Sequence, residues 1–150
     1  MNIRKAKHAE STIIANLFLA SRRSALPTVP LVHSDDEVRV WYESHILPQD
    51  ATWIAEDADK IVGFMSVNKN EIDQLYLAPG HLGEGIGSMF VELAKHLYPD
   101  YLQLYTFQVN TRARVFYEKH GFTNIRMTDG EYNEEKEPDI RYEWRPLPTA

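Results

Sequence analysis

The sequence predicts an α/β fold in which a mixed, mostly antiparallel sheet of about seven strands is flanked by about four helices. Three observations support this prediction. Three strand-like segments follow one another with short turn-prone stretches between them, which is typical of an antiparallel meander. A glycine-rich segment then leads directly into an amphipathic helix. From there to the end of the chain, strand-like segments alternate with helical ones, and one mixed sheet accounts for this order.

The first third of the chain contains one short strand and two helices. The strand is predicted at Ile3 to Ala6. Residues His8 to Leu26 carry apolar side chains at helical spacing, and a proline follows directly. Ser34 and Glu37 then form a capping box, because each side chain can reach the exposed backbone N–H of the other. A second helix is therefore predicted to begin here, and Pro48 is expected to end it.

The middle of the chain supplies the meander and the glycine-rich segment. Strands are predicted at Thr52 to Glu56, Ile61 to Asn68 and Glu71 to Leu77. Four of the seven glycines lie within eight positions shortly afterwards. The helix that follows carries an apolar stripe made of Ile86, Met89, Phe90, Leu93, Ala94 and Leu97.

The last third adds a strand, a short helix and two more strands. Tyr101 to Val109 is rich in aromatic and aliphatic residues, which favours a strand. Asn110 is a good N-cap for a short helix, and Gly121 closes that helix in a left-handed conformation. The acidic segment Asp129 to Asp139 is predicted to be a loop between the last two strands, the second of which runs near Ile140 to Trp144.

Composition limits the class of protein. A chain of 150 residues with 43% hydrophobic and 25% charged residues is expected to form one domain over residues 1–150. It contains no cysteine, which excludes disulfides, thiolate metal sites and a cysteine nucleophile and favours a cytoplasmic location. A net charge of −6 disfavours nucleic acid as a partner, and no apolar run of about 20 residues suits a membrane. The six histidines show no metal-ligand spacing, so no metal is expected.

The glycine-rich segment from Leu82 to Ser88 has the chemistry of an anion site. Glycines let a backbone approach its ligand closely, and the free N–H groups at the start of a helix favour phosphate. A tight turn alone would need one glycine, whereas Gly83, Gly85 and Gly87 occupy every second position. Three common motifs do not match. Ser88 stands where a dinucleotide fingerprint needs glycine, no lysine suits a P-loop, and Ser88 is not centred in a nucleophile elbow.

Two motifs resemble those of the GNAT superfamily of N-acetyltransferases. Leu75-Tyr76-Leu77-Ala78-Pro79, followed by Gly83-Glu84-Gly85-Ile86-Gly87-Ser88, is similar to the acetyl-CoA loop of that family, whose pattern is Q/R-x-x-G-x-G/A. The second family pattern, N-x-x-A-x-x-F-Y-x-x-x-G-F, is matched by Asn110, Ala113, Phe116, Tyr117, Gly121 and Phe122. The predicted elements follow the order of the family's fold, so the resemblance covers nearly the whole chain. One position departs from the pattern, because Leu82 stands where the family has glutamine or arginine.

The resemblance implies direct acetyl transfer from acetyl-CoA to a primary amine of a small molecule or a protein. It implies Tyr117 as the general acid that protonates the departing thiolate. Glu71 resembles the general base of family members that acetylate lysine, and Asp73, two residues further and so on the same strand face, is the alternative. The coenzyme is expected to contact Leu75, Tyr76, Leu77, Leu82, Gly83, Glu84, Gly85, Ile86, Gly87, Ser88, Asn110 and Tyr117, with backbone amides forming the anion site.

Alternatives stay open at several of these positions. Because Leu82 lacks the polar side chain of the family, the chain is alternatively an acyl-CoA-binding regulatory module without catalysis. Tyr117 has a structural explanation as a core residue, Asn110 as a helix cap, and the Glu71–Asp73 pair as solvated carboxylates. The sequence decides neither the amine acceptor nor the oligomeric state, and a homodimer stays open.

Three further groups of residues are candidates for substrate contact. The aromatic residues Trp41, Tyr42 and Trp53 either line an acceptor pocket or belong to the core. Arg112 and Arg114, at the start of the last helix, either meet the coenzyme 3′-phosphate or face solvent. The acidic loop either borders the acceptor side of the cleft, where it would attract a cationic amine, or is solvated surface.

Overall fold

The computed structural model describes residues 1–148 and contains a seven-stranded sheet in the order β1-β2-β3-β4-β5-β7-β6. The strands are β1 (Asn2–Lys5), β2 (Ala51–Asp57), β3 (Lys60–Asn68), β4 (Glu71–Leu77), β5 (Leu102–Phe107), β6 (Thr123–Met127) and β7 (Asp139–Trp144). Neighbouring strands are antiparallel except for β4 and β5, which run parallel. The predicted mixed, mostly antiparallel sheet is therefore confirmed.

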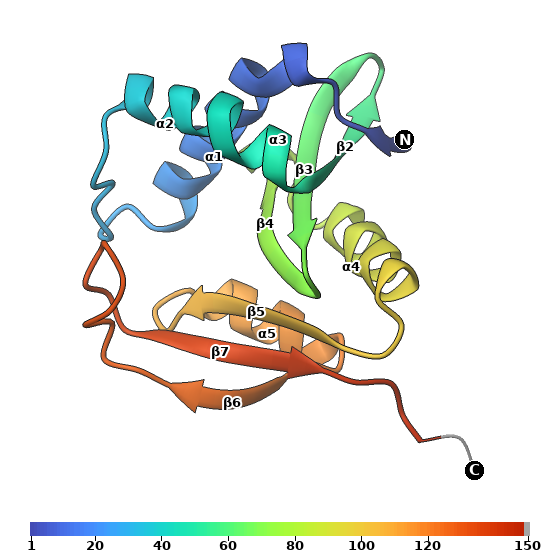
Figure 1. Cartoon of the computed structure of the whole chain (residues 1–150), viewed down its shortest axis with the longest axis vertical. Helices are drawn as coiled ribbons and strands as arrows, with labels where there is room; N and C mark the ends of the chain where they lie inside the picture. The colour runs from blue at the N-terminus through green and yellow to red at the C-terminus, as the bar shows by residue number, and fades with distance from the viewer. Residues whose placement is uncertain (149–150) are drawn as a thin grey trace.

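Helices cover both faces of this sheet (Figure 1). A short 3-10 turn leads into α1 (Ser11–Ala25). The second helix consists of α2 (Asp35–Trp41), a π-helical turn (Tyr42–Ile46) and α3 (Leu47–Gln49). The remaining helices are α4 (Ile86–Leu97) and α5 (Thr111–Lys119). No helix within residues 1–148 combines the length and hydrophobicity that a membrane span requires.

The second helix begins as predicted and ends later than predicted. The Glu37 backbone N–H donates to Ser34 Oγ at 3.2 Å, and the Ser34 N–H donates to Glu37 Oε1 at 2.9 Å, which confirms the capping box. Pro48 does not end the helix, because the last helical residue is Gln49. The wider π-helical turn directly before Pro48 changes the hydrogen-bond register, so the missing proline N–H breaks no regular α-helical ladder.

Two hydrophobic clusters form the core, one on each face of the sheet. On β3, Phe64 packs toward α1 and α2, whereas its neighbour Met65 packs toward α4, as the alternation of strand side chains requires. The buried stripe of α4 differs from the predicted one. Met89 lies at the edge of the stripe and Leu97 at the end of the helix, so they are 41% and 39% exposed, and Val91 is buried instead.

Candidate active site

The sheet divides between β4 and β5. These parallel strands share one paired position, Glu71 opposite Gln103, near their N-terminal ends. Beyond it they diverge, and Figure 1 shows β5 and β7 running across the direction of β3 and β4. The edge of β4 from Ile72 to Leu77 therefore has no strand partner on its β5 side. Backbone N–H and C=O groups along this edge are available to a ligand.

A β-bulge in β4 adds to this divergence. Ser66 of β3 pairs with Gln74, whereas the next residue, Val67, pairs with Ile72, so Asp73 is the extra residue of the bulge. A bulge bends its strand and changes the direction of nearby side chains. The sequence placed Asp73 and Glu71 on the same strand face because side chains alternate along a regular strand. The bulge interrupts this alternation at Asp73.

The glycine loop has the backbone geometry that its sequence predicts. Gly83 and Gly85 both have positive φ, at 80° and 84°, a conformation that residues with a Cβ rarely adopt. Gly85 is the N-cap of α4, so the first N–H groups of that helix point into the loop without partners inside the helix. The loop from Leu82 to Gly85 is exposed, and its N–H groups and helix dipole suit a phosphate.

Gly87 allows two helices to pack closely. A Cβ at this position would lie 3.0 Å from Cζ of Phe116, so the glycine allows α4 and α5 to approach closely. Both Gly87 and Ile86 are buried, and Ile86 contributes its side chain to the core. Each of these two residues can therefore contact a ligand only through its backbone.

The other side chains of the loop have partners of their own or face solvent. Leu82 is 40% exposed and makes no polar contact, as its apolar chemistry dictates. Glu84 is paired with His81 at 3.1 Å. The Ser88 hydroxyl forms a 3.0 Å hydrogen bond with Nε2 of His120, and this bond ties the start of α4 to the end of α5.

An arginine from α5 lies next to the loop. Arg112 is exposed, and its Nη2 atom lies 4.0 Å from the position of a Cβ at Gly83. The neighbouring Arg114 donates instead to the Gln108 carbonyl at 3.1 Å. Of the two arginines singled out in the sequence, Arg112 is thus the one beside the phosphate-binding geometry.

Tyr117 lies on α5 in the centre of the molecule. Its ring packs edge-on against Phe116 and Phe122, and 8% of the residue is exposed. Its hydroxyl has no hydrogen-bond partner within residues 1–148, yet it is not among the buried unpartnered atoms, so it keeps contact with solvent. Burial, with a smaller contribution from the nearby Tyr76, raises the pKa of Tyr117 well above its ordinary value. The phenol therefore carries its proton at neutral pH.

Asn110 caps α5 as predicted. Its Oδ1 atom accepts the Ala113 backbone N–H at 3.1 Å. This hydrogen bond fixes the first turn of the helix that carries Tyr117.

Three carboxylates gather around the bulge of β4. Burial, and then the charge of Asp73, raise the pKa of Glu71, and the Gln103 amide donates to its Oε1 at 3.3 Å. Asp73 itself is exposed. The third carboxylate, Asp50, was missed in the sequence; burial and Asp73 raise its pKa to about 7, and its Oδ2 atom is buried without a partner. No local pattern identifies Asp50, because it reaches Asp73 only through the pairing of β2, β3 and β4.

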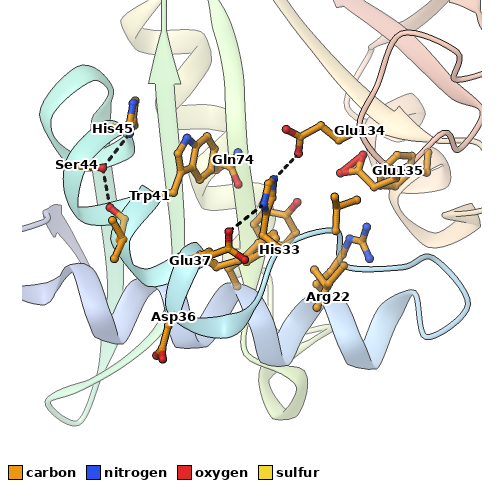
Figure 2. Close-up of a pocket in the computed structure, with 17 residues that line it drawn as sticks. Arg22, His33, Asp36, Glu37, Trp41, Ser44, His45, Gln74, Glu134 and Glu135 are labelled. Atoms are coloured by element: carbon orange, nitrogen blue, oxygen red, sulfur yellow. Dashed lines mark hydrogen bonds and ion pairs between the residues drawn. The ribbon is translucent and has the colours of Figure 1, made fainter.

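A cavity lies between α1, α2, the open end of β4 and the acidic loop (Figure 2). Its volume is about 830 Å³. Aromatic side chains supply much of its wall, namely Phe18, Trp41, Tyr76 and Phe107. Four carboxylates also line it, Asp36 and Glu37 from α2 and Glu134 and Glu135 from the acidic loop. Of the two alternatives for the acidic loop, a border of a cleft or solvated surface, the position of Glu134 and Glu135 agrees with the first.

The aromatic residues proposed from the sequence divide between pocket and core. Trp41 lines the cavity and is 43% exposed. Tyr42 is fully buried, with its hydroxyl donating to Gln74 at 2.8 Å. Trp53 packs against the core cluster on the α4 side of the sheet.

His33 joins the two acidic walls of the cavity. Its Nε2 atom lies 3.0 Å from Glu134 of the acidic loop, and its Nδ1 atom lies 3.9 Å from Glu37 of α2 (Figure 2). These contacts hold the acidic loop against α2, although Glu134 and Glu37 are far apart in the sequence.

Glu71 lies on the cavity side of the sheet. Gln103, which contacts Glu71, and Phe107, which lines the cavity, are four residues apart on β5 and so share a face. Leu102 and Leu104 point to the opposite face, into the core beneath α4. Glu71 therefore shares the sheet face of the cavity, although it is not among the residues that line the cavity.

Relatives in sequence support an acyl-transfer function. The family model described as an acetyltransferase (GNAT) domain matches residues 48–124. The peptidyl-lysine N-acetyltransferase YjaB of Salmonella typhimurium is 35% identical over 126 residues, covering 81% of this chain and 83% of that protein.

Solved structures share the fold. The apo form of YjaB from Escherichia coli superimposes with a TM-score of 0.79 at 24% identity, covering 95% of this chain and 96% of that one. The PaiA N-acetyltransferase of Thermoplasma acidophilum, in complex with coenzyme A, gives a TM-score of 0.73 at 19% identity, covering 97% and 98%.

The family model and the sequence relatives are those of an acetyl-CoA-dependent transferase. The chain belongs to the GNAT family of N-acetyltransferases. It is an enzyme that transfers an acetyl group from acetyl-CoA to an amine. The family, fold, enzyme class and coenzyme predicted from the sequence are confirmed, and the reading as a non-catalytic module is not favoured.

Proposed function

We propose that this enzyme acetylates the ε-amino group of lysine in proteins or peptides. The observation that carries the proposal is the cavity of about 830 Å³, which opens beside the divided sheet and has acidic walls. Carboxylates from two elements attract a cationic amine, and Trp41 offers a flat surface to an aliphatic chain. The Salmonella relative is named a peptidyl-lysine N-acetyltransferase, which supports the same acceptor.

The coenzyme fits the divided edge of β4 and the glycine loop. The phosphates would bind the N–H groups of Gly83 to Ser88, with Arg112 supplying a positive charge. The exposed side chain of Leu82 has no polar group, so it adds no hydrogen bond to the phosphates, and the backbone N–H groups would bind them. The unpaired edge at Leu75 to Leu77 would hold the pantetheine arm. Asn110, which caps α5, would contact this arm as well. Acetyl-CoA supplies an acyl group activated as a thioester.

Two proton transfers are assigned to residues of this chain. The Tyr117 hydroxyl, which is protonated and has no internal partner, gives a proton to the departing sulfur. Glu71 takes a proton from the acceptor ammonium, directly or through water, because an alkyl amine with a pKa of about 10 is protonated at neutral pH. Its pKa is raised toward neutrality by burial and by Asp73, which makes it a better base. Asp73, supported by Asp50, is the alternative base.

The test is release of free thiol from acetyl-CoA with a panel of amines, followed by mass spectrometry of the acetylated product. Lysine peptides should be turned over with a higher kcat/KM than free neutral amino acids. Glu71→Gln should lower the rate at neutral pH and recover part of it as pH rises and free amine becomes available. If Asp73→Asn shows this recovery and Glu71→Gln does not, Asp73 is the base. Turnover of small amines alone would refute the lysine proposal.

The same proposal extends to the setting of the enzyme. A single domain over residues 1–150 working in the cytoplasm would meet both acetyl-CoA and protein lysines. Copurification with cytoplasmic acetylated proteins would test this location.

A further inference from the structure

Tyr76 is held rigidly at the inner wall of the acceptor cavity. Its ring packs edge-on against Phe18 of α1, with ring centroids 4.9 Å apart, and in a tilted arrangement against Phe64 of β3 at 5.8 Å. The residue also lines the cavity. Contacts from a helix and a strand therefore fix the direction in which its hydroxyl points.

The Tyr76 hydroxyl has no partner within residues 1–148. It is also absent from the buried unpartnered atoms, so it is open to the cavity that the residue lines. Other tyrosines in the core are different: Tyr42 donates to Gln74 at 2.8 Å, and Tyr142 donates to Glu118 at 2.6 Å. Phenols in protein interiors normally find a hydrogen-bond partner. A rigid phenol that lacks one and faces a cavity is available to a ligand.

Charged side chains of the cavity lie near Tyr76. Burial raises the pKa of Tyr76 to about 12, while Arg22 lowers it and Asp73 and Glu135 raise it. Arg22 and Glu135 both line the cavity, as Tyr76 does. An amine that enters between these charged groups would therefore reach the Tyr76 phenol.

We propose that Tyr76 is a positioning residue whose hydroxyl oxygen accepts a hydrogen bond from the acceptor nitrogen and holds it at the inner wall of the cavity. This role adds a substrate-positioning residue to the acetyl transfer described above. It rests on one part of the proposed function, namely that the amine enters through this cavity. This role belongs to the Tyr76 side chain. It is separate from the role of the Tyr76 backbone, which belongs to the strand edge assigned to the pantetheine arm.

The test compares Tyr76→Phe with Tyr98→Phe. Both changes remove one hydroxyl and keep the ring, and Tyr98 is likewise partly buried but packs against the opposite core cluster, away from the cavity. The probes are a peptide amide that contains one lysine and, as a second amine, spermidine. The measurements are acceptor KM, kcat, the Kd of coenzyme A by calorimetry and the melting temperature.

Tyr76→Phe should raise the acceptor KM about tenfold, the effect of one lost hydrogen bond in binding, with coenzyme Kd and melting temperature unchanged. Tyr98→Phe should leave all four quantities unchanged. An unaltered acceptor KM in Tyr76→Phe would overturn the proposal, as would a change confined to coenzyme Kd. The comparison is made with whichever probe the wild type acetylates. If the wild type acetylates spermidine but not the peptide, the lysine acceptor is refuted. The effect of Tyr76→Phe on the KM for spermidine then still tests the positioning role of Tyr76.

Discussion

The ring of Phe116 lies against Gly87, so close that a Cβ on the glycine would be 3.0 Å from Cζ and 3.2 Å from Cε1 of the ring. This contact joins α4, which begins at the glycine loop, to α5, which carries Tyr117. The spacing between that loop and Tyr117 therefore depends on the absence of one methyl group.

Replacing Gly87 by alanine should destabilise the protein. The ring of Phe116 would have to move, and overpacking of this kind costs about 1–3 kcal/mol, more than the gain of up to about 1 kcal/mol from alanine in a helix. Thermal unfolding should show a lower melting temperature. Gly80→Ala is the control, because a Cβ there meets no atom within 4 Å. Equal stability of the two variants would show that Phe116 moves aside without cost.

Tyr117→Phe should lower kcat by about 10²-fold and leave the Kd of coenzyme A nearly unchanged. The missing proton affects the departing sulfur, whereas the ring and its contacts with Phe116 and Phe122 stay in place. Steady-state kinetics and calorimetry test the two halves of this prediction. Wild-type turnover in the variant would make Tyr117 a core residue alone.

Asp50→Asn should gain stability relative to the wild type as pH rises from about 4 to about 7. The pKa of Asp50 is raised from 3.8 to about 7, so the folded protein binds this proton more tightly than the unfolded chain does. Ionisation of the unfolded chain in this window therefore opposes folding, and asparagine removes that opposition.

Melting temperatures at pH 5 and pH 8 measure this effect. Asp57→Asn, at the exposed end of the strand that follows Asp50, is the matched control and should follow the wild type at both pH values. A constant difference between Asp50→Asn and the wild type would show that Asp50 ionises in the folded protein as it does in water.

Neutralising the acidic wall of the cavity should reduce the salt dependence of catalysis. Glu134 and Glu135 line the cavity, so the double change to glutamine should lower kcat/KM for a polycationic peptide at low salt. The difference should shrink as salt rises, because screening acts over about 8 Å at physiological ionic strength.

The control for the acidic wall changes Glu131 and Glu137 to glutamine. These residues belong to the same loop and remove the same charge, but they do not line the cavity. Identical salt profiles for the two double variants would show that the loop acts only through its overall charge.

Local patterns predicted those features that depend on neighbouring residues. The capping box at Ser34, the cap at Asn110 and the positive φ of Gly121 all follow from a few adjacent positions, and the structure has each of them. The two motifs of the family likewise lie in short segments. In the same way, alternation and turn composition were sufficient to find the meander from β2 to β4.

Features that depend on distant residues were not predictable. Burial and then Asp73 raise the pKa of Asp50, and Asp73 reaches it across two strand pairings. The requirement for glycine at position 87 comes from Phe116 on another helix. Pro48 was read as a helix end because nothing in the local sequence indicates the π-helical turn before it. The free hydroxyl of Tyr76 is visible only once the cavity is known.

The unpaired edge of β4 has a consequence for solubility. Exposed strand edges are templates for pairing with other chains, and proteins usually place them at the border of a sheet, where charges or bulges discourage aggregation. Here the open edge lies between two strands of the same sheet, because β4 and β5 pair at Glu71 and Gln103 alone. The bulge at Asp73 twists part of this edge, and the remainder is the stretch assigned to the pantetheine arm. Concentrated protein should therefore aggregate more slowly on storage when coenzyme A is present than when it is absent.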